Sequence, residues 1–188
     1  MTKTLILLFH PDLTRSKANL AMARAAGTLP GVEVVDMTAV APDGFDLSRD
    51  GETEAARLLA ADRIVLQFPM QWYSTPPLLK AWQDAVLTRM FYLEYEAEGR
   101  HLEGRSLMIA TTAGNTPEAY RHGGANLMPM ADLLAPLRTT AHRCGLVWAE
   151  PFVVYRADKL TPEELDATAA DYCAALNRWI ETSTQKAA

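Results

Sequence analysis

The sequence predicts an α/β fold in which helices cover both faces of one parallel sheet. Short, continuous apolar runs are typical of parallel strands that are buried on both faces, and five of them recur along the chain. Amphipathic helical patterns separate these runs, as expected for strands joined by helical crossovers. No repeat or low-complexity linker divides the 188 residues. We therefore expect a single domain, 1–188, with residues 181–188 frayed at its end.

The five predicted strands are the apolar runs themselves. They cover residues 4–9, 32–37, 62–68, 105–112 and 146–155. The first, TLILLF, contains no charge at all, which favours a central position in the sheet.

Helical periodicity predicts the elements between and after the strands. The predicted helices cover residues 16–27, 52–60, 75–86, 129–144 and 161–180. Ser16 and Thr75 are suited to cap the first and third of these helices, with Pro76 at the first helical position of the third. Pro136 should break the fourth, and Thr161 with Glu164 forms a capping-box pattern at the start of the last.

Composition and charge exclude several classes of function. A net charge of −5 argues against nucleic-acid and anionic-membrane binding, which need a basic face. Cys144 and Cys173 form no CxxC pattern and are expected to be reduced core thiols. The four histidines lack metal-ligand spacing, so we expect no metal site. The apolar N-terminal run is too short for a signal or membrane segment, and a cytoplasmic location is expected.

Ligands of an open α/β sheet bind beyond the carboxyl ends of the strands, where the strand order reverses. The turn after the first predicted strand, HPDLTRSKAN, has neither a GxGxxG nor a P-loop motif. It does offer the hydroxyl of Ser16, the cation of Arg15 and a helix N-terminus, a combination that suits a phosphate. Taken alone, the simpler interpretation of Ser16 as a helix cap is favoured.

The turn after the third predicted strand is unusually aromatic. The stretch FPMQWYSTPPLLKAW, residues 68–82, holds two tryptophans, a tyrosine and three prolines. Such a turn could bury area by packing, or it could support a flat ligand. The turn after the fourth strand, TTAG at residues 111–114, allows close approach of backbone N–H groups, although as a motif it is weak.

Together, these three blocks identify a resemblance that covers nearly the whole chain. With HP…SxAN, FPMQWYS…PPLLKAW and TTAG in this order, the chain resembles the flavodoxin-like NAD(P)H:quinone oxidoreductases. It is most similar to the small ancillary oxidoreductases of glutathione-gated potassium efflux systems. The resemblance implies a flavodoxin-like, doubly wound, five-stranded parallel sheet with strand order 2-1-3-4-5. FMN would bind where that order reverses.

The resemblance also implies roles for individual residues. The flavin phosphate would be held by His10, Ser16, Lys17, Ala18 and Asn19. The isoalloxazine and ribityl would lie along Pro69, Met70, Gln71, Trp72 and Tyr73. Backbone donors to the pyrimidine edge would come from Thr111, Thr112, Ala113 and Gly114. Tyr120, or less closely His122, would stabilise the reduced flavin as a catalytic residue.

The implied activity is ping-pong hydride transfer from NAD(P)H through FMN to a quinone or a similar small aromatic acceptor, with FAD not excluded as the flavin. A homodimer is expected from the family. The alternative is a regulatory ancillary protein with little or no turnover, which binds a potassium efflux transporter at the inner face of the membrane. An electron-carrier flavodoxin fits the aromatic turn less well.

Two departures from the family and three ambiguous residues limit these expectations. Ala113 stands where the family usually has glycine, and residues 89–104 lack the glycine-rich run of close relatives, which leaves the acceptor open. Trp82 and Trp148 are expected in the core rather than at the site. His10 could serve the site or simply bond a loop carbonyl.

Overall fold

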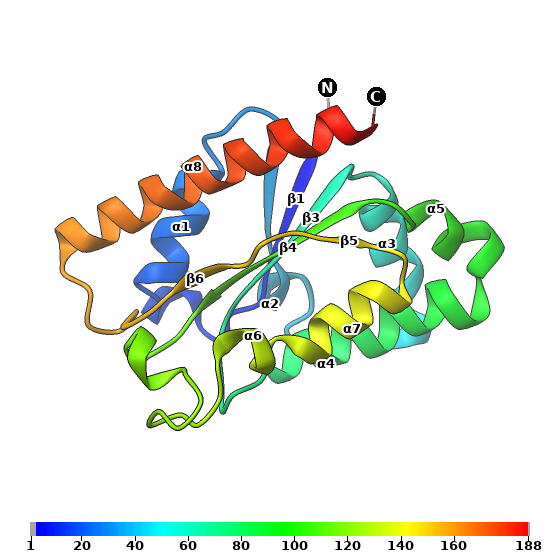
Figure 1. Ribbon diagram of the computed structural model, residues 1–188. Coiled ribbons are helices and arrows are strands. Elements are labelled where there is room, and N and C mark those ends of the chain that lie inside the picture. The colour runs from blue at the N-terminus through cyan, green and yellow to red at the C-terminus, as the bar shows by residue number, and fades with distance from the viewer. Residues whose placement is uncertain (1–2, 188) are drawn as a thin grey trace.

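The computed structural model describes residues 3–187 and consists of one parallel sheet between two helical layers (Figure 1). The strand order is β2-β1-β3-β4-β5, with a further strand β6 that also pairs with β4. The strands are β1 (Thr4–Leu8), β2 (Val32–Asp36), β3 (Arg63–Pro69), β4 (Ser106–Thr112), β5 (Val147–Trp148) and β6 (Phe152–Val154). The predicted fold class and strand order are confirmed.

The helices divide between the two faces of the sheet. On one face, α1 (Ala18–Ala26) lies beside the long C-terminal helix α8 (Pro162–Ala187) (Figure 1). The opposite face carries most of the remaining helices: α3 (Leu47–Leu59), α4 (Pro77–Trp82), α5 (Arg100–Leu102), α6 (Met130–Leu133) and α7 (Ala135–Arg143). A short helix α2 (Met37–Val40) follows β2, and 3-10 turns cover Leu13–Arg15 and Pro117–Ala119. Each face buries its own apolar core.

The predicted single strand over residues 146–155 is wrong, because the structure splits it. Ser106 pairs with Val147, whereas Ala110 pairs with Phe152, so one extra residue lies between β5 and β6 relative to β4. Such a bulge reverses which face the following side chains take. Trp148 accordingly packs into the α3–α7 core and Phe152 into the α1–α8 core. Pro151, which cannot donate to a ladder, lies within the break.

Two predicted helix caps, Ser16 and Thr75, are not the caps in the structure. Helix α1 begins at Ala18, and its cap residue, Lys17, makes no side-chain cap hydrogen bond. The Asp12 side chain instead caps the preceding 3-10 turn, and Ser16 ends that turn. Helix α4 begins at Pro77 with Pro76 as cap residue, so Thr75 is not the cap. Proline still occupies the first helical position, where its missing N–H costs nothing.

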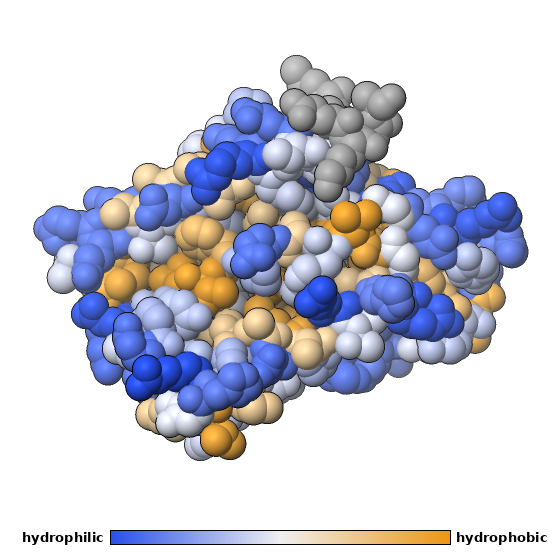
Figure 2. All heavy atoms as spheres, in the orientation of Figure 1, coloured by the Kyte–Doolittle hydropathy of each residue, from blue (hydrophilic) through white to orange (hydrophobic). Residues whose placement is uncertain are grey.

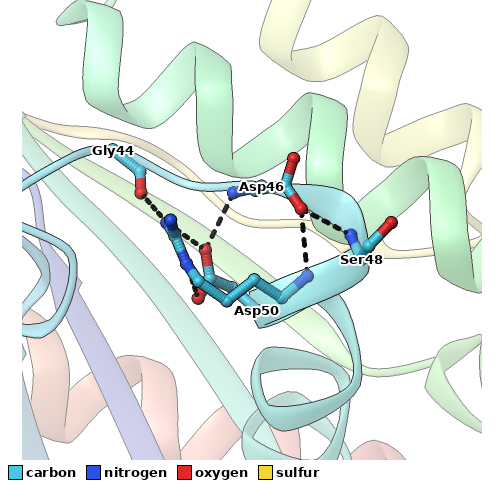
Figure 3. Close-up of polar contacts among 5 residues, drawn as sticks. Gly44, Asp46, Ser48 and Asp50 are labelled. Carbon is cyan, nitrogen blue, oxygen red and sulfur yellow. Dashed lines mark hydrogen bonds and ion pairs between the residues drawn. The ribbon is translucent and has the colours of Figure 1, made fainter.

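Helix α3 starts five residues earlier than predicted, because aspartates cap its first turn (Figure 3). Apolar periodicity alone does not reveal such a cap. The Asp46 carboxylate accepts hydrogen bonds from the Ser48 and Arg49 backbone N–H groups at 2.9 and 3.0 Å. In return, Asp50 accepts from the Asp46 N–H at 2.8 Å. Arg49 closes the cluster through its pair with Asp50 and a bond to the Gly44 carbonyl. The free N–H groups of the first turn are thereby satisfied.

The segment after α4 continues in wide π-helical turns that the sequence did not indicate. These turns cover Gln83–Leu87, Arg89–Leu93 and Tyr95–Gly99. Arg89 pairs with Glu98 at 2.9 Å and holds the last two turns together. A Cβ at Gly99 would lie 2.3 Å from the Met90 carbonyl oxygen, so this close approach requires glycine.

The remaining helix predictions are confirmed. The break near Pro136 lies at Leu134, between α6 and α7. At the start of α8, the Glu164 N–H donates to Thr161 Oγ1 and the Thr161 N–H donates to the Glu164 carboxylate, which is the predicted capping box. The backbone is helical as far as Ala187, and residue 188 lies outside the described residues. Fraying of 181–188 stays a prediction.

Candidate functional site

Two adjacent pockets open at the carboxyl end of the sheet, where the chain leaves β1, β3 and β4. The first, which we call the phosphate pocket, has a volume of about 280 Å³. Its walls are His10, Arg15, Ser16, Lys17, Ala18, Asn19, Pro69, Met70, Thr112, Ala113, Gly114, Ala157 and Asp158. Strands β1 and β2 lie on one side of this point and β4 and β5 on the other, so it is the position where the strand order reverses.

The charge of the phosphate pocket favours an anion. Arg15 and Lys17 are exposed at its rim, and the hydroxyl of Ser16 lies between them in sequence. The pocket also includes the first residues of α1, whose leading N–H groups have no carbonyl partner within the helix. Asp158 adds one carboxylate to the same wall. Two cations, a hydroxyl and a helix N-terminus are suited to a phosphate monoester.

The second pocket, which we call the ring pocket, has a volume of about 200 Å³. Its walls are Met70, Trp72, Tyr73, Gly114, Asn115, Tyr120 and Asn126. It shares Met70 and Gly114 with the phosphate pocket, so the two form neighbouring parts of one site. Aromatic and amide side chains around a small-residue turn favour a flat, polar-edged ligand.

The aromatic turn at the end of β3 is a tight two-residue hairpin. Gln71 and Ser74 exchange two backbone hydrogen bonds of 2.9 Å, and the two residues between them have φ values of +46° at Trp72 and +64° at Tyr73. Glycine and asparagine are the usual residues in this left-handed region, and bulky side chains there are strained. The Trp72 side chain is 93 % exposed. Strain of this kind clusters at ligand-binding positions.

Two further observations on β4 concern its carboxyl end. The Thr112 hydroxyl accepts a 2.9 Å hydrogen bond from the Asn19 amide, and both residues line the phosphate pocket. Ala113 is buried, and its N–H donates to the Val154 carbonyl at 2.8 Å. This backbone donor is therefore already used within the sheet.

Burial shifts the pKa values of one histidine and two tyrosines in or beside the site. Partial burial lowers the pKa of His10, against the opposing effect of Asp12 and Asp36. Burial, with a smaller contribution from Tyr73, raises the pKa of Tyr120. Tyr120 packs against Tyr155 with ring centroids 5.5 Å apart, and burial raises the pKa of Tyr155 as well. Tyr120 is a protonated O–H at neutral pH, as an ordinary tyrosine is, and burial extends that protonated form to higher pH.

Most residues predicted from the sequence line one of the two pockets, and three do not. Gln71 forms the base of the hairpin, Thr111 is fully buried in β4, and the His122 side chain is 79 % exposed, with Nε2 3.7 Å from Asp132 Oδ2. The His10 Nδ1 accepts from the Asp12 N–H at 3.1 Å, so its ring binds its own loop as well as facing the pocket.

Sequence reasoning noted the Arg15 cation but missed four wall residues. They are Asn115, Asn126, Ala157 and Asp158. Ala157 and Asp158 lie in the segment between β6 and α8, and the hydrogen bond from the Ala157 N–H to the Ala113 carbonyl (3.1 Å) brings that segment to the site. Ligands of an open α/β sheet bind beyond the carboxyl ends of its strands. Only this general rule could have indicated that the segment after β6 contributes to the site.

The residues present fit a flavin mononucleotide. The phosphate pocket supplies the cations and N–H groups that its phosphate needs, and the ring pocket supplies aromatic walls. A Cβ added at Gly114 would make one ordinary contact, with Asp158 Oδ1 at 3.7 Å. Glycine there allows a flat ring to approach the main chain closely.

Other parts of the molecule offer different features. A larger cavity of about 670 Å³ lies between the β5–β6 edge and α8, and Figure 2 shows hydrophobic side chains gathered in the hollow beside that helix. Within residues 3–187, no cluster of three or more acidic, histidine or cysteine side chains could hold a metal ion. No helix in this described part of the chain has both the length and the apolar character needed to span a bilayer.

A family model described as the flavodoxin-like fold matches residues 2–177. The chain belongs to this flavodoxin-like family. The match covers every strand and all helices up to the middle of α8.

Individual relatives within the family are similar over nearly the whole chain. The glutathione-regulated potassium-efflux system ancillary protein KefF of Klebsiella aerogenes is 40 % identical over 177 residues, which are 94 % of this chain and 96 % of KefF. The crystal structure of general stress protein 14 from Treponema denticola in complex with FMN has a TM-score of 0.82 and 32 % identity, and covers 94 % of this chain and 98 % of that one. An NADPH-quinone reductase from P. pentosaceus has a TM-score of 0.76 and 29 % identity, with coverage of 92 % and 96 %.

Proposed function

We propose that the protein is an FMN-dependent NAD(P)H:quinone oxidoreductase. The observation that carries the proposal is the junction of the phosphate pocket and the ring pocket through Met70 and Gly114 at the point of strand-order reversal. The FMN complex of general stress protein 14 and the NADPH-quinone reductase support it, because both chains are matched over more than nine-tenths of their length.

In this proposal each wall has one task. Arg15, Lys17 and the N-terminus of α1 bind the phosphate. The FMN complex of general stress protein 14 favours FMN over FAD. Trp72 and Tyr73 support one side of the ring. When bound there, FMN would supply the hydride chemistry between NAD(P)H and the acceptor.

Charge on the reduced flavin is stabilised by donors from the chain. Tyr120 lines the ring pocket, and its hydroxyl is protonated at neutral pH and can donate a hydrogen bond. Because the Ala113 N–H is engaged with Val154, we assign backbone donation to Gly114 rather than to Ala113. His122 is exposed and lines neither pocket, so we assign it no contact with the flavin.

A titration with FMN and NADPH tests the proposal. We expect the purified protein to bind FMN with a flavin absorbance spectrum, NADPH to bleach that spectrum under anaerobic conditions, and menadione to restore it. Failure to bind FMN after reconstitution would overturn the proposal. If NADPH bleached the spectrum but menadione did not restore it, the protein would still be a flavoprotein that NADPH reduces, but a quinone would not be its acceptor.

A homodimer is part of the proposal, because large hydrophobic side chains near the ring pocket are exposed. They include Trp72 at 93 %, Leu127 at 67 % and Met128 at 42 %. Burial of such a group by a second copy would shield the ring from water. Light scattering during size exclusion should give twice the chain mass of 20.7 kDa, and a monomer would reject this part.

A second candidate function is the regulation of a potassium efflux transporter at the membrane, as the name of KefF suggests for that relative. The cavity between β5–β6 and α8 favours it, because this apolar surface lies at the end of the sheet away from the ring pocket. Reconstituted transporter with and without the protein should show a change in potassium flux. Equal flux would reject this role and leave the oxidoreductase proposal intact.

A further inference from the structure

The inference concerns a glutamine in the middle of the sheet. Gln67 lies on β3, is 0 % exposed, and pairs with Leu8 on one side and Ala110 on the other. Its neighbours on that face are the apolar residues of the α1–α8 core. An amide in such a place is costly unless all its polar atoms are bonded, so its partners explain its presence.

The partners of Gln67 form a chain of hydrogen bonds that ends in the phosphate pocket. Tyr172, fully buried on α8, donates to Gln67 Oε1 at 3.3 Å. Gln67 Nε2 donates to the Asn19 carbonyl at 2.9 Å and lies 3.4 Å from Asn19 Oδ1. Asn19 Nδ2 then donates to Thr112 Oγ1 at 2.9 Å. Asn19 and Thr112 line the phosphate pocket, whereas Gln67 and Tyr172 do not.

The direction of each hydrogen bond in this chain is fixed by one backbone carbonyl. The Asn19 carbonyl oxygen can only accept, so Gln67 must turn its NH₂ toward it and its Oε1 toward Tyr172. With the Gln67 NH₂ beside it, Asn19 turns its own oxygen inward and its NH₂ toward Thr112. A reversed amide at either position would bring two acceptors or two donors together.

The orientation of the Asn19 amide determines how the Thr112 hydroxyl can bond. A threonine hydroxyl has one donor proton, and here its oxygen accepts from Asn19, so the proton remains for another acceptor. Thr112 is only 5 % exposed, and that exposure is toward the pocket it lines. We propose that Gln67 and Tyr172 are positioning residues, which hold the Asn19 amide so that Thr112 presents its hydroxyl proton to an anionic or carbonyl acceptor of the bound ligand.

The inference rests on the proposed function in naming FMN as that ligand, and two separate measurements test it. The first is FMN affinity. Gln67→Met keeps the length of the side chain and should weaken FMN binding by roughly fivefold, the value of about one hydrogen bond. Thr112→Val should lose a similar factor, and the double variant should lose no more than either single variant. Additive losses, or unchanged affinity in Gln67→Met, would overturn the inference.

Tyr172→Phe and Thr4→Val complete this set. Tyr172→Phe removes only the outermost donor and should weaken FMN binding by roughly twofold, since the Asn19 carbonyl still orients Gln67. Thr4→Val removes a buried hydroxyl at the opposite end of the sheet and should leave the affinity unchanged. If Thr4→Val weakened FMN binding as much as Gln67→Met does, the effect would come from a general destabilisation of the fold. Gln67 would then not be a positioning residue.

The second measurement does not depend on flavin. In the nuclear magnetic resonance spectrum of the ligand-free protein, the two Asn19 side-chain N–H signals, assigned by their absence in Asn19→Asp, should be protected from exchange. Gln67→Met should remove that protection, and Thr4→Val should retain it. Protection that persists in Gln67→Met would overturn the inference. If the wild-type protein binds no FMN, the proposed function fails, while this measurement still decides whether Gln67 holds Asn19.

Discussion

Two tryptophans ten residues apart show how differently the two halves of one stretch are used. Trp72 lies in the hairpin after β3 with positive φ and is 93 % exposed. Trp82 ends α4, is 2 % exposed, and packs edge-on against Phe9 with ring centroids 5.7 Å apart. Its Nε1–H donates to the buried Glu54 carboxylate at 3.3 Å. Trp82 therefore stabilises the fold by burial, whereas the exposed Trp72 contributes little to stability.

The comparison teaches that strain and exposure together, rather than residue type, mark the ligand side. The hairpin holds Trp72 and Tyr73 in a conformation that costs free energy, leaves Trp72 almost fully exposed and buries only about half of Tyr73. Helix α4, only three residues beyond the hairpin, starts at a proline and has a buried face. Support of a ligand ring by these two side chains would explain why the protein keeps this strained conformation.

The largest expected effect is on stability at the buried member of the pair. Trp82→Ala should lower the free energy of unfolding by about 3–5 kcal/mol, because it opens a cavity in the core and leaves Glu54 without one of its partners. Urea unfolding measures this value. Trp72→Ala is the matched control and should change stability by less than about 0.5 kcal/mol. Similar losses for both would break the comparison.

Flavin affinity should reverse that order. Trp72→Ala should weaken FMN binding by about tenfold through loss of aromatic contact worth about 1.4 kcal/mol. Trp82→Phe, which keeps an aromatic ring in the core, should bind FMN as the wild-type protein does. Fluorescence quenching of FMN gives both constants. A greater loss of affinity in the Trp82 variant would assign the wrong tryptophan to the ring.

Backbone strain in the hairpin can be separated from the side chain. Tyr73→Gly should be more stable than Tyr73→Ala by about 1 kcal/mol, because only glycine occupies positive φ without a steric cost. At Tyr92, which is exposed in a helical turn, the same pair should show the opposite order. Urea unfolding gives the stability of all four variants. Equal stability of Tyr73→Gly and Tyr73→Ala would show that the backbone at residue 73 is not strained.

The smallest expected effect concerns the tyrosine opposite the hairpin. Burial raises the pKa of Tyr120 above its ordinary value of 10.0, so the folded protein holds this proton more tightly than the unfolded chain. The resulting stabilisation is fully present below the unfolded pKa and is lost as pH rises through the folded pKa. The stability difference between wild type and Tyr120→Phe should therefore shift against the wild type from roughly pH 9 to roughly pH 11. A constant difference would show that burial does not perturb Tyr120.

Much of this architecture was predictable because burial leaves a direct trace in sequence. The runs TLILLF and SLMIATT are apolar because β1 and β4 are covered on both faces, and the capping pair Thr161 and Glu164 is local. The aromatic turn and the phosphate turn were found by residue type. The positive φ values of Trp72 and Tyr73 in the aromatic turn were not, since no glycine or asparagine marks them.

What could not be predicted depends on contacts between distant segments. The Ala157 N–H reaches the Ala113 carbonyl from 44 positions along the chain, and nothing near either residue indicates it. Asp158 reaches the phosphate pocket in the same way. Gln67 reads as a polar interruption of a strand until Asn19 and Tyr172 are seen around it. The bulge between β5 and β6 appears only in the register with β4.

That bulge has a consequence for solubility. The β5–β6 side of the sheet pairs only with β4 in the described chain, so its outer edge could template the strand of another molecule, and an apolar cavity lies beside it. The break places Pro151 and the charged Glu150 at this edge and leaves segments of only two and three residues. A run so short and interrupted is a poor template for intermolecular β pairing. The protein can therefore keep an open hydrophobic hollow at its rim without becoming prone to aggregate.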